Sequence, residues 1–356
     1  MGVGKLKFAM IGGGEKSFIG PIHRMAVRMD DLAELVDGCY SHHDDWHALL
    51  ERVRGKVDFI TVCTPNDSHF EIAKAALGMG FHVLCEKPVS MNAKEARELE
   101  RLAKAKRRIL AVPFTYTGSA MVKLAHDLVA KGELGRICKV NVEYVQGSFR
   151  RIDPNEPTDR RNVWKKDPRR SGPSCVIADI GVHAAALIEY ITGLKIERVL
   201  ADISTFSKGT TLEDDASILM RLTKGAKAAL VTSKIATGEE NGVRVRVYGE
   251  KASLFWNQED PNYLHVKYPF APERIYKRKA PYMRELSPTA ERLSRIPAGH
   301  PEGFIEAFAN IYREFCAAVR GEKGRDFPTI ATGVMTMRFV DASLKSAKAG
   351  GRWTAL

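Results

Sequence analysis

KLKFAMIGGGEKSFIG, residues 5–20, joins a short apolar run to a glycine-rich turn. The apolar run over 5–11 predicts a strand, residues 20–29 have the apolar spacing of a helix, and residues 32–40 are apolar again. This order predicts a βαβ unit. Strand, turn and helix N-terminus would bring backbone N–H groups to one point, which is how proteins bind a dinucleotide pyrophosphate.

The spacing of the glycines differs from GxGxxG. Five residues separate Gly14 from Gly20, where that motif has two. Taken alone, the segment could equally be a simple tight turn. An interpretation as a nucleotide-binding loop therefore depends on the rest of the chain.

The alternation of strand and helix continues downstream. We expect strands at 57–63, 82–85 and 109–112, and helices at 69–79 and 93–105. This pattern predicts a doubly wound parallel sheet, in which ligands bind beyond the carboxyl ends of the strands. Polar clusters stand at two such ends: Thr64-Pro65-Asn66 and Glu86-Lys87-Pro88.

Length and composition predict a folded protein of two domains. At 356 residues the chain is longer than one hydrophobic core usually supports, and its 44% hydrophobic and 28% charged residues are typical of globular proteins. No apolar stretch approaches the roughly 18 residues that span a bilayer, and no signal peptide is recognisable. The six cysteines are far apart and form no CxxC pair. We therefore expect a cytoplasmic protein without disulfides, structural zinc or membrane association.

The net charge of +12 is concentrated in residues 150–170 and 265–295. Neither stretch has the interleaved aromatics of a nucleic-acid module, so we expect solvated loops or a rim that attracts an anionic small molecule, and no nucleic-acid partner. A metal site is not predicted either. His42, His43 and His47 could cluster, but no Cys or carboxylate pattern completes a tetrahedral set.

Four groups of residues together resemble the Gfo/Idh/MocA oxidoreductases. They are Gly12-Gly13-Gly14 with Ile19-Gly20 and His23, Thr64-Pro65-Asn66 with His69, Cys85-Glu86-Lys87-Pro88, and Asp179-Ile180-Gly181-Val182-His183. The resemblance covers nearly the whole chain. It implies an α/β protein with an N-terminal Rossmann domain that binds NAD or NADP. It also implies a C-terminal α/β domain with a large, mostly antiparallel, open-faced sheet that covers the nicotinamide and binds a sugar or cyclitol.

By this resemblance we expect domains at 1–117 and 118–326, with 327–356 returning to the Rossmann domain. One branch of the family shares the longer glycine loop, and it also has counterparts of residues 238–242 and of the 299–303 segment that precedes a helix with Phe304, Phe308 and Tyr312. One departure concerns the second crossover. Only 15 residues separate Ser41 from Val57, so this connection is either genuinely short or lacks residues.

The resemblance assigns the catalytic roles to Lys87, Asp179 and His183. Oxidation of an alcohol needs a base that removes the hydroxyl proton while the cofactor takes the hydride, and His183 is the predicted base. Asp179, four residues earlier at the start of a helix, could orient or charge the imidazole. The alternatives are a helix cap for Asp179 and a structural role for His183. Lys87 is predicted to position substrate or relay a proton, although it could be a surface lysine.

The remaining predicted site residues contact the cofactor or the substrate. The cofactor contacts are Gly12, Gly13, Gly14, Phe18, Ile19, Ser41, Thr64, Pro65, Asn66, His69, Glu86, Lys87 and Pro88. The substrate contacts are Tyr116, Trp164, Lys165, His183 and His300, since aromatic rings stack on sugar faces. The second strand ends in Cys39-Tyr40-Ser41 with neither the acid of NAD readers nor a following arginine, so NAD is favoured and NADP stays possible.

The sequence thus predicts an NAD(P)-dependent dehydrogenase or reductase of a sugar, sugar derivative or cyclitol. A redox-assisted glycosidase is one alternative, because some relatives oxidise a hydroxyl transiently to release a glycosidic bond. A cofactor-binding regulator without turnover is another. We expect a homodimer or homotetramer, because strands such as 137–145 and 244–248 alternate in polarity and need cover on one face.

Overall fold

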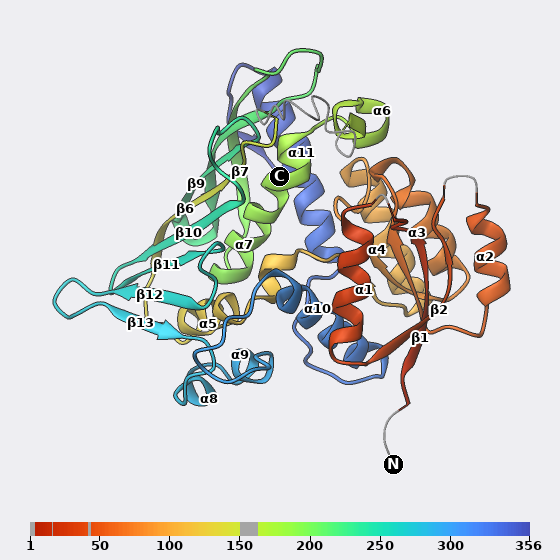
Figure 1. Ribbon diagram of the computed structural model, residues 1–356. Coiled ribbons are helices and arrows are strands. Elements are labelled where there is room, and N and C mark those ends of the chain that lie inside the picture. Colours follow the sequence, from red (N-terminus) through yellow and green to blue (C-terminus); the bar gives the residue numbers. More distant parts are fainter. Residues whose placement is uncertain (1–3, 16, 42–43, 150–162) are drawn as a thin grey trace. The chain divides into compact units, whose positions relative to one another are not determined.

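The computed structural model describes residues 4–15, 17–41, 44–149 and 163–356. These residues form two compact units (Figure 1). Unit 1 takes in the described parts of Met1–Phe114, Asp159–Pro173 and Phe308–Met337, and unit 2 takes in the rest.

Unit 1 contains a five-stranded parallel sheet in the order β2-β1-β3-β4-β5. The strands are β1 (Leu6–Gly12), β2 (Ala33–Cys39), β3 (Phe59–Cys63), β4 (His82–Cys85) and β5 (Leu110–Ala111). All five residues of β3 are buried, as expected for a strand covered on both faces. The predicted doubly wound parallel sheet is confirmed.

The helices of unit 1 begin and end where local signals place them. They are α1 (Ile19–Met29), α2 (Trp46–Val53), α3 (His69–Gly78), α4 (Ala93–Lys106) and α6 (Pro168–Ser171), with the first part of α11 (Ile330–Lys348) and most of α10 (Phe304–Val319). The Asn92 side chain caps α4 by accepting the Glu95 N–H at 3.0 Å. From α10, Phe315 packs edge-on against Phe59 at 5.1 Å between ring centroids.

The short connection after β2 holds a helix of eight residues, α2. Asp45 begins it, because its carboxylate accepts the N–H groups of His47 at 2.8 Å and Ala48 at 3.1 Å. Two helical turns are therefore enough to carry the chain from β2 to β3.

Unit 2 contains a nine-stranded sheet in the order β13-β12-β11-β10-β6-β9-β8-β7-β14. The strands are β6 (Ile137–Val145), β7 (Ile196–Ser204), β8 (Asp215–Leu222), β9 (Lys227–Ser233), β10 (Gly242–Gly249), β11 (Ser253–Asn257), β12 (Tyr263–Lys267), β13 (Arg274–Lys277) and β14 (Thr354–Ala355). Every neighbouring pair is antiparallel except β6 with β9. The predicted large, mostly antiparallel sheet is confirmed.

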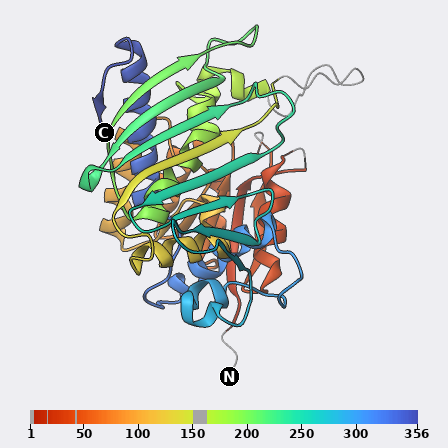
Figure 2. The same ribbon diagram turned by 90° about the vertical axis from the view of Figure 1, so that its left-hand side faces the viewer.

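One face of this sheet packs against helices α5 (Ala120–Ala130) and α7 (Val182–Thr192). The other face is open within unit 2 and is turned toward the viewer in Figure 2. Strand β8 shows the reason, because Ala216, Ile218 and Met220 are buried while the alternate residues are exposed. Two short helices, α8 (Met283–Leu286) and α9 (Pro288–Arg292), complete the unit. No helix in the described parts of the chain has both the length and the apolarity to cross a membrane.

Candidate functional site

The glycine loop after β1 is packed too closely to accept side chains. Gly12 and Gly13 have φ of 82° and 72°. A Cβ on Gly12 would lie 2.6 Å from the carbonyl carbon of Cys63, and one on Gly20 would lie 2.0 Å from the carbonyl oxygen of Gly13. The loop therefore lies directly on the end of β3 and on the first turn of α1.

The N-terminus of α1 is suited to an anion. Phe18, which precedes the helix, provides no side-chain cap, and the first turn holds no acidic residue. Ser17 accepts one N–H of this turn, from Gly20 at 3.2 Å. The remaining N–H groups and the positive end of the helix dipole can meet a phosphate. The residues present thus fit the pyrophosphate of a dinucleotide.

An acid lies at the end of β2, although the sequence places none there. Asp44 Oδ2 accepts the backbone N–H groups of Tyr40 and Ser41, both at 2.9 Å. The carbonyl oxygen of Tyr40 would lie 2.7 Å from a Cβ on Gly14, so this strand end borders the glycine loop. In Rossmann folds a carboxylate near the end of the second strand binds the ribose 2′-OH of NAD, so Asp44 is a candidate for this contact. The sequence interpretation missed Asp44, because it stands three residues beyond Ser41.

Asn66 and His69 tie together the turns at the carboxyl ends of β3 and β4. Asn66 is buried and its Nδ2 donates to the Ser171 carbonyl at 2.9 Å. The buried His69 ring lies between the carbonyls of Pro88 (2.7 Å) and Thr64 (2.8 Å). Burial lowers the pKa of His69, and the two carbonyls only partly oppose this. Both ring nitrogens face backbone, so a cofactor contact from His69 stays a prediction.

Glu86 and Lys87 follow β4, and the Lys87–Pro88 peptide bond is cis. The buried Glu86 carboxylate accepts the Lys87 N–H at 3.0 Å, and its other oxygen lies 3.1 Å from His23 Nε2. On the far side of the ring, His23 Nδ1 lies 2.6 Å from the Tyr312 hydroxyl. Burial raises the pKa of Tyr312, so its hydroxyl stays protonated and donates to His23.

This Tyr312–His23–Glu86 network lies wholly within unit 1 and joins α10, α1 and the end of β4. A neutral His23 with its hydrogen on Nε2 satisfies every contact in it. The network therefore fixes the Glu86 carboxylate, which in turn holds the backbone of Lys87 by accepting its N–H. Sequence analysis singled out all three residues but did not connect them.

In unit 2, Asp179 lies on a π-helical turn, Ile177–Gly181, that leads directly into α7. The buried Glu213 carboxylate holds the start of this turn by accepting the N–H groups of Cys175 at 2.9 Å and Ile177 at 3.2 Å. Asp179 Oδ2 lies 2.6 Å from Nζ of Lys234. We expected a continuous helix from Asp179; the structure instead has the π turn, a deviation often found at functional sites.

His183 lies on the first turn of α7 beside two tyrosines. Its ring centroid is 5.2 Å from that of Tyr116 and 6.0 Å from that of Tyr144. The side chain is buried. Two of the predicted residues, Tyr116 and His183, are thus brought together, and Tyr144 is an addition that sequence reasoning missed.

Tyr116, Tyr144 and Asn241 form a closed ring of hydrogen bonds. Tyr144 donates to Asn241 Oδ1 at 2.9 Å, Asn241 Nδ2 donates to the Tyr116 hydroxyl at 3.0 Å, and Tyr116 completes the ring to Tyr144 at 2.7 Å. Burial raises the pKa of both tyrosines, so both remain protonated. Since each phenolic hydrogen is used within the ring, Tyr116 offers a further group only an acceptor lone pair.

The other predicted substrate contacts lie in different places. Trp164 and Lys165 belong to unit 1, with the lysine Nζ 5.9 Å from the centre of the indole ring system. His300 is exposed in unit 2. Its backbone carbonyl accepts a hydrogen bond from the Arg278 guanidinium. Arg278 also pairs with Glu302 at 3.0 Å, and both side chains are buried. Of the basic stretch 150–170, residues 150–162 lie outside the described residues.

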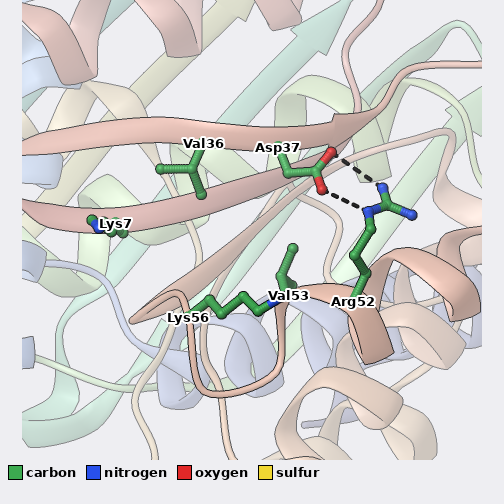
Figure 3. A pocket seen from close by; sticks show the side chains of 6 residues that line it. All are labelled: Lys7, Val36, Asp37, Arg52, Val53 and Lys56. Atoms are coloured by element: carbon green, nitrogen blue, oxygen red, sulfur yellow. Dashed lines mark hydrogen bonds and ion pairs between the residues drawn. The ribbon is translucent and has the colours of Figure 1, made fainter.

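A hollow of about 230 Å³ lies between the end of α2 and strands β1 and β2 (Figure 3). It is lined by Lys7, Val36, Asp37, Arg52, Val53 and Lys56. Asp37 and Arg52 are bound to each other at 2.8 Å across it. Lys7 is near the start of β1, whereas the glycine loop follows its end, so this hollow is not part of the predicted cofactor edge. No group of three potential metal ligands occurs among the described residues, from which His42 and His43 are absent.

Comparison with known proteins decides the family. Residues 22–114 match the oxidoreductase family with an NAD-binding Rossmann fold, and residues 122–255 match the GFO/IDH/MocA C-terminal domain. The uncharacterized oxidoreductase YfiI of Bacillus subtilis is 31% identical over 98% of this chain and 96% of its own length. The chain belongs to the Gfo/Idh/MocA family of oxidoreductases.

Two further members of the Gfo/Idh/MocA family have informative names. An inositol dehydrogenase homologue from Azotobacter vinelandii, crystallised with NADH and myo-inositol, has a TM-score of 0.91 and 32% identity over 99% of this chain and 98% of its own. Levoglucosan dehydrogenase of Pseudarthrobacter phenanthrenivorans is 27% identical over 85% of this chain and 80% of its own length. The resemblance stated from sequence is confirmed, and with it the NAD-binding Rossmann unit.

Proposed function

We propose that this oxidoreductase transfers a hydride between NAD and a hydroxyl or keto carbon of a sugar, sugar derivative or cyclitol. The observation that carries the proposal is the position of His183 in a member of this family. Its side chain is buried beside the aromatic ring of Tyr116. Its relatives include a levoglucosan dehydrogenase and a protein crystallised with myo-inositol, which supports a polyhydroxylated substrate.

Bound NAD would supply the hydride chemistry, and the protein's own residues would move the proton and hold the substrate in position. His183 removes the proton from the reacting hydroxyl. The Tyr116 oxygen, whose own hydrogen is used by Tyr144, accepts a hydrogen bond from a neighbouring substrate hydroxyl. Lys87, on the turn after β4, donates to the reacting oxygen and stabilises its developing negative charge.

The experiment is a nicotinamide-absorbance screen over sugars, cyclitols and their acidic derivatives, with analysis for cleaved glycosides. We expect His183→Ala to lower kcat by about a hundredfold or more, because a general base typically contributes about 10²–10⁴. NAD affinity, measured by calorimetry, should hardly change. His126→Gln is the matched control: His126 also lies in unit 2 and bonds the Tyr190 carbonyl at 2.7 Å. Wild-type turnover in His183→Ala would contradict the base assignment, and cleaved glycoside would favour the glycosidase alternative.

The open face of the nine-stranded sheet supports assembly into a homodimer or homotetramer. Arg198, Arg221, Lys227 and Lys139 lie directly opposite one another on four adjacent strands. Such a row of like charges is unfavourable unless something neutralises it. Farther along the same face, Leu219 is 50% exposed, and beyond it lie Asp202 and Glu143, of which Glu143 already pairs with Arg244 and Arg246.

These charges suit a second copy turned by 180° about an axis across the strands. The basic row of each copy then faces Asp202 of the other, and the apolar residues meet between them. Light scattering should show a dimer or larger species, and Leu219→Asp should dissociate it. A wild-type monomer at micromolar concentration would refute this assembly. A cytoplasmic location is also proposed, because all six cysteines are free thiols.

A further inference from the structure

Lys234 follows the last residue of β9 and is a buried lysine to which no role has been given so far. Its side chain is 2% exposed. Nζ lies 2.6 Å from Asp179 Oδ2 and 4.9 Å from the centre of the Phe149 ring. Its backbone N–H donates to the Asp214 carbonyl at 2.8 Å, which fixes the lysine to the start of β8. Lys234 is thus buried against Asp179, and we expect its effect on the reaction to pass through this carboxylate.

The pair is charged. Burial by itself would lower the pKa of Lys234, but Asp179, with Cys175 and Glu213 behind it, more than compensates, and the pKa is raised. An ammonium in such a place is tolerated because its partner is an ion at hydrogen-bond distance. Removing either partner would take away the ion that the other contacts at 2.6 Å in a largely buried place.

Asp179 is the more exposed member of the pair and the one nearer in the chain to His183. It is 20% exposed and stands on the π turn that leads into the first turn of α7, where His183 lies. Its negative charge also contributes to the raised pKa of Tyr116 and Tyr144, after the larger effect of burial. The carboxylate is thus within electrostatic reach of Tyr116 and Tyr144, the two rings that lie beside His183.

We propose that Lys234 is a positioning residue for the reaction: as the counter-ion of Asp179 it fixes the carboxylate on the π turn and thereby sets the orientation of His183. The inference rests on the proposed function, in which His183 is the base. A sequence signal exists for it, since Lys234 is a lone charge directly after the apolar strand β9.

The test is a double-mutant cycle of Lys234→Met, Asp179→Asn and both together. Lys234→Met should lower kcat about tenfold to a hundredfold, the usual range for a lost hydrogen bond between ions, and should change KM little. Because Lys234 acts only through Asp179, adding Lys234→Met to Asp179→Asn should cause no further loss of kcat. Each single variant should unfold at a lower temperature than wild type. The double variant, in which neither charge of this ion pair remains, should recover part of that difference.

Lys195→Met is the matched control. It breaks another lysine ion pair of unit 2, with Glu189 at 2.7 Å, and should leave kcat unchanged. Losses of kcat that multiply in the double variant would overturn the inference, because Lys234 would then act independently of Asp179. If Lys234→Met does not fold, the double variant decides, and wild-type kcat in it would also overturn the inference.

A spectroscopic readout separates this inference from the proposed function. The imidazole signals of His183, assigned by their loss in His183→Ala, should move in Lys234→Met and in Asp179→Asn, and should stay in Lys195→Met. This measurement needs neither substrate nor cofactor. Unmoved His183 signals overturn the inference even where no substrate has been found. Wild-type kcat in His183→Ala would instead overturn the proposed base.

Discussion

Replacing Tyr312 with phenylalanine tests the buried network beneath Lys87. The substitution deletes one hydroxyl and keeps the ring, which packs edge-on against His23 at 5.8 Å between centroids. The side chain is 1% exposed, so water does not replace what is lost. Its hydroxyl has two partners in unit 1, His23 Nδ1 at 2.6 Å and Thr61 Oγ1 at 3.4 Å.

The magnitude follows from these two distances. The contact with Thr61 is long and contributes little, so the loss is dominated by His23. A buried acceptor left without its donor costs about 1–3 kcal/mol. For a unit of this size each kcal/mol corresponds to about 2–4 °C in the midpoint of thermal unfolding. Tyr312→Phe should therefore unfold roughly 2–12 °C below wild type. Turnover should also fall, because Glu86, which holds the Lys87 backbone, loses the support of a fixed His23.

Thermal unfolding followed by circular dichroism measures the effect. Tyr282→Phe is the control, because Tyr282 is 38% exposed and water can take over the bond that its hydroxyl accepts from the Lys277 N–H. We expect the control to stay within about 0.5 kcal/mol of wild type. Equal stability of Tyr312→Phe and Tyr282→Phe would show that His23 does not depend on Tyr312, and the network would then have no structural role.

Three other changes test separate features. Gly20→Ala should weaken NAD binding by roughly tenfold or more in calorimetry, because its Cβ would lie 2.0 Å from the Gly13 carbonyl oxygen; unchanged affinity would count against the loop as the pyrophosphate site. Asp44→Asn should raise the affinity for NADP relative to NAD in fluorescence titrations, since a carboxylate repels the 2′-phosphate. Asp45→Asn, which removes a neighbouring charge but keeps a capping oxygen for α2, should leave that ratio alone, and an equal shift in both would refute the assignment. Arg278→Met should lower the free energy of unfolding by about 3–5 kcal/mol in chemical denaturation, because the buried Glu302 loses its ion-pair partner. An unchanged midpoint of unfolding would mean that this ion pair contributes nothing to stability.

The elements of unit 1 were predictable because their signals are local. Strand β4 occupies the expected residues 82–85, α3 begins at His69 and α4 begins at Ala93, as expected. Buried parallel strands are apolar throughout, and the helices between them have an apolar periodicity that can be read residue by residue, with side-chain caps at α2 and α4. The fold class and the family followed from the same segments together with the motifs at the strand ends.

The site was predictable only where a motif marks it. Lys234 meets Asp179 across 55 residues of sequence, and Asn241 meets Tyr116 across 125. Such pairs are created by strand order and register in the nine-stranded sheet, which no local pattern specifies. Asp44 was missed for a different reason, because it stands three residues beyond Ser41 in the sequence, yet its carboxylate accepts the N–H groups of Tyr40 and Ser41 at the end of β2.

Unit 1 is assembled from three stretches of chain, and this has a consequence for biosynthesis. The strands of the five-stranded sheet are synthesised early. Phe315, whose ring packs against Phe59, and Tyr312, whose hydroxyl donates to His23, are synthesised late. The last strand of this sheet, β5, likewise pairs with a residue that is synthesised late, because Ala111 forms a backbone bridge with Thr329. The apolar core of unit 1 therefore stays incomplete in the nascent chain through most of translation. Premature termination before α10 should yield a fragment with exposed core surface, which chaperones retain and proteases remove.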